Sequence, residues 1–233
     1  MKAVIVAAGM STRLHSLKEA RGIPKCLLPV DGNTIIDRAV DNLRYCGIPY
    51  IVVVTGYRAE DIRFHLGNKV EYVNNPFYEY CNDMASLWFA KDYIDGDEFI
   101  YMHSDVVFDS QILKDLVYCS YEDVLSVDLK ECDKEDMKVV LDRGKLIESS
   151  KEIPLDKADG EWIGLAKFLN SKRLFDNIEF WLEEGYLNEY DTLAFTDLAR
   201  RGYIINSCYT EGRKWVEIDY PEEYEWACKQ TWS

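Results

Sequence analysis

Short apolar runs alternate with amphipathic stretches over the first 105 residues. Residues 3–7 form a continuous apolar run that ends at glycine, which is typical of a buried parallel strand. Residues 34–45 place their apolar side chains on one helical face. The same patterns predict strands at 50–54, 70–73 and 99–102 and helices at 59–66 and 83–93. Such alternation indicates βαβ units and a parallel sheet that is covered on both faces.

The pattern changes after residue 105. It predicts a surface loop at 149–160, helices at 171–184, at 192–201 and from Pro221 onward, and strands at 124–127, 137–141, 145–147, 164–168, 204–205 and 215–218. There is no internal repeat, low-complexity tract or interdomain linker. We therefore expect a single domain over residues 1–233, of the α/β class. Its predicted architecture is three-layer and Rossmann-like: a mostly parallel sheet, helices on both faces and a small mixed C-terminal portion.

Composition narrows the classes of protein. The 233 residues include 27 Lys and Arg against 42 Asp and Glu, a formal charge of −15, and 48% are apolar. Disorder and general nucleic-acid binding are therefore disfavoured. No run approaches the roughly 20 apolar residues of a membrane span, and the N-terminal run is too short for a signal peptide. Seven cysteines without a CxxC pair indicate reduced thiols, so we expect a cytoplasmic protein.

One candidate cluster follows the first strand. It consists of residues 7–14 and of Pro24 with Lys25. Its small residues would let backbone N–H groups approach a phosphate or base, and Thr12 and Arg13 can donate to phosphate oxygens. The glycine spacing fits neither the dinucleotide fingerprint nor the P-loop. The competing interpretation is an ordinary turn with one solvated arginine.

Two carboxylates also stand directly after predicted strands. Asp105 follows the strand at 99–102, and Asp219 follows the strand at 215–218. Ligands of parallel α/β sheets bind beyond the carboxyl ends of the strands. Mg²⁺ is commonly held by one or two carboxylates together with substrate phosphates, so the pair predicts a magnesium site. Each aspartate alone could instead be a helix N-cap, and Asp219 precedes Tyr220 and Pro221 as a cap would.

Taken in this order, the clusters resemble the signature of the GT-A-type nucleotidyltransferases. Those enzymes join a nucleoside triphosphate to a phosphate-bearing small molecule and release pyrophosphate. Their AAGxGTRL, PK, strand-end Asp and W-x-DID-like elements are similar to residues 7–14, 24–25, 104–105 and 215–219. The resemblance covers essentially the whole chain. Two departures are Ser11 in place of a usual glycine and the long stretch at 14–23.

Two further segments narrow the resemblance. Residues 75–87 are similar to the N…Y…NN…SL segment of the phosphocholine and 2-aminoethylphosphonate cytidylyltransferases, and residues 160–168 to their GEWxGL segment. A Gln-rich base-reading region, common in sugar-1-phosphate members, is absent. The resemblance implies transfer of a cytidylyl group from CTP to a small phosphate or phosphonate acceptor. It would place Asn82 and Ser86 near the nucleotide, although both could simply cap the following helix.

The resemblance also implies roles for single residues. Arg13 and Lys25 would be catalytic, and Asp105 and Asp219 would hold Mg²⁺. The nucleotide would be bound by Ala7, Ala8, Gly9, Met10, Ser11, Thr12, Asn82, Ser86 and Ser104. The acceptor would be bound by Glu161, Trp162, Tyr190, Asp197 and Trp215. Residues 1–105 would form the nucleotide-binding half and 106–233 the acceptor-binding half.

Aromatic faces and carboxylates both attract ammonium groups, so Glu161 is the predicted contact of an acceptor head group. None of the three histidines is needed, and His103 is expected to be structural. The expected partners are CTP and the acceptor, without nucleic acid or membrane, and the sequence is compatible with a homodimer. Two alternatives stay open: a sugar-1-phosphate nucleotidyltransferase and a non-catalytic nucleotide-binding module.

Overall fold

The computed structural model describes residues 1–14 and 16–232. His15 therefore lies outside the described residues. The helices are α1 Ile35–Tyr45, α2 Ala59–Leu66, α3 Asp83–Trp88, α4 Lys91–Ile94, α5 Ser110–Tyr118, α6 Ser171–Glu183, α7 Thr192–Arg200 and α8 Pro221–Cys228. The strands are β1 Lys2–Ala7, β2 Pro29–Val30, β3 Asn33–Thr34, β4 Ile51–Thr55, β5 Glu71–Asn74, β6 Phe99–His103, β7 Val106–Phe108, β8 Val124–Asp128, β9 Lys138–Asp142, β10 Lys145–Ser150, β11 Gly160–Phe168, β12 Asn206–Tyr209 and β13 Trp215–Glu217.

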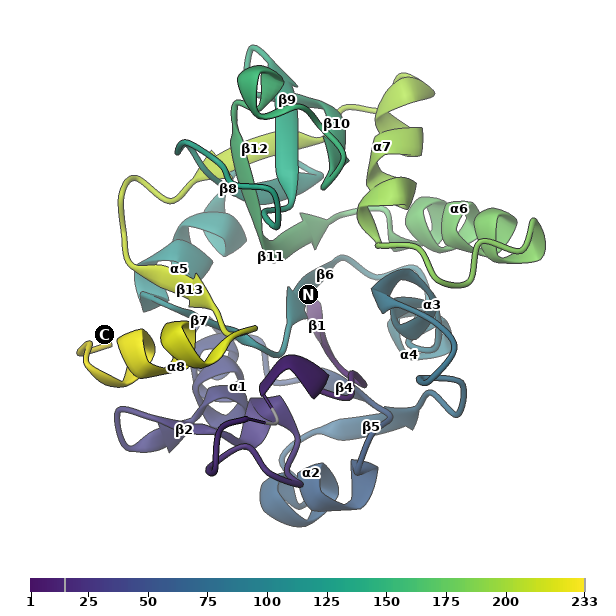
Figure 1. Ribbon diagram of the computed structural model, residues 1–233. Helices are drawn as coiled ribbons and strands as arrows, with labels where there is room; N and C mark the ends of the chain where they lie inside the picture. The colour runs from purple at the N-terminus through teal and green to yellow at the C-terminus, as the bar shows by residue number, and fades with distance from the viewer. Residues whose placement is uncertain (15, 233) are drawn as a thin grey trace.

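One large sheet runs through the molecule (Figure 1). Its described strands number nine, in the order β5-β4-β1-β6-β11-β8-β12-β10-β9. The pairs among β5, β4, β1 and β6 are parallel, whereas β11 pairs antiparallel with both β6 and β8. The three-layer α/β prediction is confirmed. The mixed part of the sheet is larger than the small C-terminal portion that the sequence suggested.

The two faces of the sheet have separate cores because side chains alternate along each strand. In β1, Ala3, Ile5 and Ala7 face a core shared with α1, α2 and α5. Val4 and Val6 face the opposite core, which is shared with α3, α4, α6 and α7. These layers hold the carboxyl ends of β1 and β6 rigidly side by side, where the candidate residues begin.

Three predicted elements differ from the structure. The helix expected at 83–93 is divided into α3 and α4, because Phe89 and Ala90 donate to carbonyls three residues back and tighten the chain. The strand expected at 204–205 starts at Asn206. Ile205 is buried, but it precedes the ladder. The loop expected at 149–160 begins later, because β10 continues to Ser150. In the first two cases the apolar pattern found buried positions but not the hydrogen bonds, and in the third the polar residues concealed the end of a strand.

A third, smaller core joins the two ends of the chain. Leu14, Leu28 and Ile218 are fully buried in it, together with apolar side chains of α8. Figure 1 shows α8 beside β2, and the Tyr224 hydroxyl donates to the Pro29 carbonyl at 3.0 Å. This packing brings the segment around Asp219 against the segment around Lys25, which precedes it by 194 residues.

Two sequence expectations concern the whole chain. All seven cysteines are free thiols, as their odd number and spacing indicated. Over residues 1–14 and 16–232, the helices are all too short or too polar to cross a membrane.

Candidate active site

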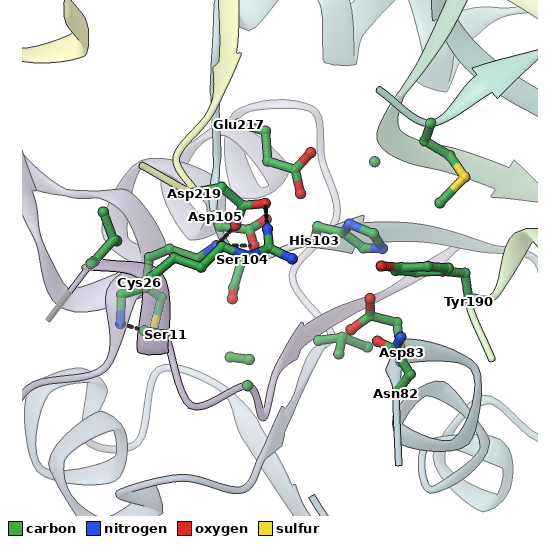
Figure 2. Close-up of a pocket in the computed structure, with 18 of the residues that line it drawn as sticks. Ser11, Cys26, Asn82, Asp83, His103, Ser104, Asp105, Tyr190, Glu217 and Asp219 are labelled. Atoms are coloured by element: carbon green, nitrogen blue, oxygen red, sulfur yellow. Dashed lines mark hydrogen bonds and ion pairs between the residues drawn. The ribbon is translucent and has the colours of Figure 1, made fainter. Parts of the chain in front are cut away.

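A cavity of about 270 Å³ lies beyond the carboxyl ends of β1 and β6 (Figure 2). Its walls come from segments that are distant in sequence: the loop after β1, the 3-10 turn at Lys25, the start of α3, the end of β6 and the segment after β13. The charged side chains that line it are Arg13, Lys25, Asp83, His103, Asp105, Lys151, Glu217 and Asp219. The strand-end clusters of the sequence therefore meet at one place.

Lys25 lies at the centre of the charge. Its ammonium is 2.7 Å from Asp105 Oδ2 and 2.7 Å from Asp219 Oδ1. Burial alone would lower the pKa of Lys25, but the carboxylates of Asp105 and Asp219 raise it well above its ordinary value. Burial alone would raise the pKa of Asp219, but Lys25 and then Arg13, which also contacts Asp219, lower it. The lysine is therefore permanently charged.

Asp219 is not a helix cap. The N-cap of α8 is Tyr220, and Glu223 Oε2 accepts the backbone N–H groups of Asp219 at 2.6 Å and of Tyr220 at 2.7 Å. The carboxylate of Asp219 is thereby left for Lys25 and Arg13. This geometry answers the alternative that the sequence left open for Asp219.

Ser11, which stands where the resembling signature has glycine, has a left-handed backbone with φ of 56°. That region favours glycine, and a side chain there is strained by about 1 kcal/mol. The serine hydroxyl accepts the backbone N–H of Lys25 at 3.1 Å. The side chain thus ties the loop after β1 to the 3-10 turn of Lys25, which a glycine could not do.

The predicted nucleotide-binding residues divide into two groups. Those that line the cavity are Ala7, Gly9, Ser11, Thr12, Asn82 and Ser104, whereas Ala8, Met10 and Ser86 do not. The Ala8 carbonyl instead accepts the Tyr57 N–H at 3.0 Å. Ser86 is buried and accepts from Asn75 at 3.0 Å. Asn82 caps α3 and also lines the cavity, so both interpretations of Asn82 hold.

Glu217 is a cavity residue that the sequence reasoning did not assign. Its carboxylate, one from Asp105 and a His103 ring nitrogen lie within 4.8 Å of one another. Burial, Asp105 and Asp219 raise the pKa of Glu217 to about 8. Asp105 Oδ1 is buried and has no hydrogen-bond partner among the described residues. Several carboxylates close together, one of them with a free buried oxygen, are the kind of oxygen ligands that a hard divalent cation prefers.

His103 differs from the two carboxylates. Its Nε2 lies 3.0 Å from Asp191 Oδ2 and 3.1 Å from the Tyr101 hydroxyl, which itself donates to Asp191 at 2.5 Å. Burial would lower the pKa of His103, but the hydrogen bond and charge of Asp191 raise it to about 10. A protonated imidazole cannot bind a metal. His103 therefore adds positive charge to the cavity, and the carboxylates of Asp105, Glu217 and Asp219 remain as the candidate metal ligands.

The predicted acceptor residues are spread over three places. Trp162 and Tyr190 line the cavity of Lys25. Glu161 and Trp215 line a neighbouring cavity, where Lys130 Nζ lies 2.7 Å from Glu161 and 3.0 Å from Asp136. Asp197 lies on α7, lines neither cavity and pairs with Arg201 at 2.7 Å. Strand β13 divides the cavities, since Glu217 and Asp219 line both.

Comparison with known proteins agrees with this geometry. The family described as MobA-like NTP transferase domain matches residues 3–183. The chain belongs to this family. It is a nucleotidyltransferase, similar to proteins that carry that activity in their names. The CTP:phosphoglutamine cytidylyltransferase of Campylobacter jejuni is 26% identical over 97% of this chain and 98% of its own length. The UTP–glucose-1-phosphate uridylyltransferase AglF of Haloferax volcanii is 30% identical over 96% of this chain and 93% of its own length.

Other curated relatives are longer. The chain spans 19% of the CMP-5'-(3-aminopropyl)phosphonate synthase of Streptomyces rubellomurinus and 50% of the bifunctional IPC transferase and DIPP synthase of Rubrobacter xylanophilus. Among solved structures, the CTP:phosphocholine cytidylyltransferase LicC of Streptococcus pneumoniae superposes with a TM-score of 0.80. That match has 22% identity and covers 98% of this chain and 97% of LicC. This likeness supports the fold of the nucleotidyltransferase.

Proposed function

We propose that this nucleotidyltransferase transfers a cytidylyl group from CTP to a small phosphate- or phosphonate-bearing acceptor and releases pyrophosphate. The observation that carries the proposal is the cluster in which Lys25 and Arg13 meet Asp105 and Asp219 beyond the strand ends. The sequence relatives named as cytidylyltransferases favour CTP and this class of acceptor.

The reaction needs no protein base. An acceptor oxygen that is already anionic attacks the α-phosphorus of CTP, forming a new P–O bond. The bond from the α-phosphorus to its bridging oxygen breaks, and that electron pair leaves with pyrophosphate. The barrier is dominated by repulsion between anions and by charge on the leaving group, so catalysis consists of positioning and electrostatics. Arg13 and Lys25 would supply the fixed positive charges next to the phosphates.

The carboxylates would complete the site with a divalent cation. Asp105 and Asp219 are the proposed ligands, with Glu217 beside them and the unpartnered Asp105 Oδ1 as the structural sign of a cation. Mg²⁺ prefers oxygen ligands and usually takes one or two carboxylates together with phosphates. When bound, it would stabilise the negative charge of the triphosphate.

The nucleotide and the acceptor would be bound by different halves of the chain. The parallel strands of residues 1–105 would bind the nucleotide along Ala7, Gly9 and Asn82. Residues 106–233 add Trp162 and Tyr190 to the opposite part of the cavity, and these would contact the acceptor.

A sugar-1-phosphate nucleotidyltransferase is the second candidate. The 30% identity to AglF over nearly the full length of both proteins favours it. A non-catalytic module is disfavoured, because Arg13, Lys25, Asp105 and Asp219 are all present and in contact.

A substrate panel separates these candidates. CTP, UTP, dTTP and GTP are each combined with phosphocholine, 2-aminoethylphosphonate, other small phosphates and glucose-1-phosphate, and pyrophosphate release is measured. The proposal predicts turnover with CTP and a small non-sugar acceptor. Preference for UTP or dTTP with glucose-1-phosphate would establish the second candidate, and the absence of turnover would favour the binding module.

Two variants test the metal ligands within the same assay. Asp105→Ala and Asp219→Ala should each abolish Mg²⁺-dependent pyrophosphate release while the circular dichroism spectrum stays native. Retained turnover in either folded variant would contradict the two-carboxylate proposal. Asp41→Ala is the matched control, since Asp41 is exposed on α1.

A further inference from the structure

Asp83 is an aspartate of the cavity that forms no ion pair with the described residues. It is the first residue of α3 and lines the cavity; Figure 2 draws it, like Tyr190, on the side away from Ser11 and Asp219. In residues 1–14 and 16–232, neither a basic group nor a hydrogen-bond donor contacts its carboxylate. By contrast, Asp105 and Asp219 are both paired with Lys25. Among the three aspartates of the cavity, Asp83 is therefore the one without a cation in contact within the described residues.

The surroundings of Asp83 disfavour the ionised form of its carboxyl group. Burial, with Asp191 and Asp105 as further causes, raises the pKa of Asp83 to about 6, while His103 and Lys25 act in the opposite direction. The carboxylate is thus mostly ionised at neutral pH and has no cation in contact. It would repel the phosphates of the proposed substrates, so it does not serve to bind them. A positively charged group of a substrate would instead be attracted.

The aromatic residues that line the cavity limit which kind of cation can bind there. Besides His103, the aromatic residues lining the cavity within the described chain are Tyr190 and Trp162. Trp162 is only 2% exposed and packs against Tyr101 and Phe195. A quaternary ammonium is usually held by a cage of several aromatic faces. A primary ammonium has three N–H donors, which a carboxylate can accept directly.

Glu161, the head-group contact expected from the sequence, already has a cation. Lys130 lies 2.7 Å from its carboxylate and is held over the Trp215 ring at 5.6 Å to the centroid. Lys130 therefore occupies the kind of position that an ammonium substrate would take there. The carboxylate of Asp83 has no such contact among the described residues, although Lys151 of the same cavity lies over the Tyr190 ring, at 5.3 Å to the centroid.

Building on the proposed cytidylyl transfer, we propose that the acceptor carries a primary ammonium group and that the carboxylate of Asp83 binds this group. The anionic end of the acceptor would then point toward Lys25 and Arg13. Asp83 is thus a specificity-determining residue: it selects an amino-phosphate or amino-phosphonate over an acceptor of the same shape without the charge. It also selects primary over quaternary ammonium.

The test compares two phosphonates that differ only in this group and adds phosphocholine, a phosphate ester that carries a quaternary ammonium. With CTP in excess, kcat/KM is measured for 2-aminoethylphosphonate, for n-propylphosphonate, which replaces the ammonium by a methyl group, and for phosphocholine. The wild type should prefer aminoethylphosphonate to propylphosphonate by roughly 100-fold or more, because a buried charge left unpaired penalises the neutral analogue. Phosphocholine should be the poorer of the two cationic acceptors.

Asp83→Asn keeps the shape of the side chain and removes the charge. It should reduce the preference for aminoethylphosphonate by about tenfold or more, through a higher KM for that acceptor, while KM for CTP changes by less than about twofold. An unchanged preference, or an equal loss with both phosphonates, would overturn the proposal. So would a wild type that favours phosphocholine.

Two further variants sharpen the comparison. Asp41→Asn changes the net charge equally on the exposed face of α1 and should leave the preference intact. Glu161→Gln tests the competing head-group contact: a loss of preference there, with Asp83→Asn unaffected, would transfer the role to Glu161. Thermal unfolding of each variant shows whether it is folded.

A binding measurement separates this inference from the proposed function. Calorimetry with aminoethylphosphonate and a non-hydrolysable CTP analogue needs no turnover. Asp83-dependent binding without turnover would refute cytidylyl transfer and keep the ammonium site. CTP turnover with acceptors that lack an amine, together with no Asp83-dependent binding of aminoethylphosphonate, would keep the transfer and refute the ammonium site.

Discussion

Two lysines are each held between two carboxylates, on opposite sides of strand β13. Lys25 lies 2.7 Å from both Asp105 and Asp219, and Lys130 lies 2.7 Å from Glu161 and 3.0 Å from Asp136. Both lysines have a pKa well above the ordinary value, because the attraction of their carboxylates outweighs burial. As ion pairs, the two clusters look alike.

What surrounds them is different. Beside Lys25 there is acid in excess: Glu217 has no cation in contact among the described residues, and Asp105 Oδ1 is buried without a partner. Beside Lys130, the ammonium contacts both carboxylates and the ring of Trp215 lies against it. The first cluster is incomplete and so is suited to a ligand. The second holds its lysine between two carboxylates and an aromatic ring, an arrangement suited to holding β11 in place.

Lys25→Met should produce the largest effect. The variant loses the permanent positive charge next to the phosphates, so kcat/KM for CTP should fall by roughly 1,000-fold or more. Pyrophosphate release measures this. Lys172→Met, on the exposed surface of α6, is the matched control. A folded Lys25→Met enzyme with near wild-type turnover would remove Lys25 from the chemistry.

Lys130→Met should instead reduce stability. It leaves the buried carboxyl of Glu161, which is 4% exposed, without the cation that contacts it, and a buried acceptor that loses its partner costs about 1 to 3 kcal/mol. Urea unfolding measures the loss, while kcat with CTP should stay within about threefold of wild type. If turnover falls as in Lys25→Met, the two clusters do not differ as described.

Glu217→Gln should have opposite effects with and without metal. Without metal, the variant should be more stable than wild type by about 1 kcal/mol, since it removes a carboxyl group whose ionisation is opposed by burial and by the neighbouring carboxylates. Saturating Mg²⁺ should stabilise the wild type by about 1 to 3 kcal/mol and the variant less. Thermal unfolding with Mg²⁺ and with EDTA checks both signs. Equal stabilisation of the two proteins by Mg²⁺ would remove Glu217 from the metal site.

The pH dependence of stability should reveal the burial of Glu161. Burial raises its pKa from 4.5 to about 7, although Lys130 acts against this. Between these values the folded protein keeps a proton that the unfolded chain has released, so the free energy of unfolding falls as pH rises. The contribution is on the order of 3 kcal/mol. Urea unfolding at several pH values should give a flatter profile in Glu161→Gln, and an identical profile would contradict the buried carboxylate.

Ser11 gives the smallest expected effect. Ser11→Ala keeps the left-handed strain and loses the hydrogen bond to the Lys25 backbone, whereas Ser11→Gly loses the bond but relieves the strain. The alanine variant should therefore be less stable than the glycine variant by about 1 kcal/mol. Chemical unfolding of the pair decides this, and equal stabilities would argue against strain at Ser11.

Much of the fold and part of the site could be predicted from the sequence. Continuous apolar runs identified the strands, strand ends identified Asp105 and Asp219, and the motif that follows the first strand identified Lys25. A stricter use of strand periodicity would also have found Glu217. It stands two residues before Asp219, as His103 does before Asp105, and residues two apart in a strand lie on one face.

The rest depends on contacts between distant segments. The sequence does not show that Lys130 neutralises Glu161 or that Asp83 has no such partner, because each depends on where other loops come to lie. It also does not show that Asp197 pairs with Arg201 on its own helix and turns away from the cavities. Residue types suggested the chemistry, but pairing in three dimensions decides which charges are free.

One feature of β11 limits how this protein can vary. Gly164 has a φ of 79°, in the irregular stretch of β11, and a Cβ there would lie 3.1 Å from the His103 ring. Any side chain would thus be strained in its backbone and would also press on the histidine. In a library of all single substitutions selected for activity, position 164 should be among the least tolerant, although its residue has no functional group.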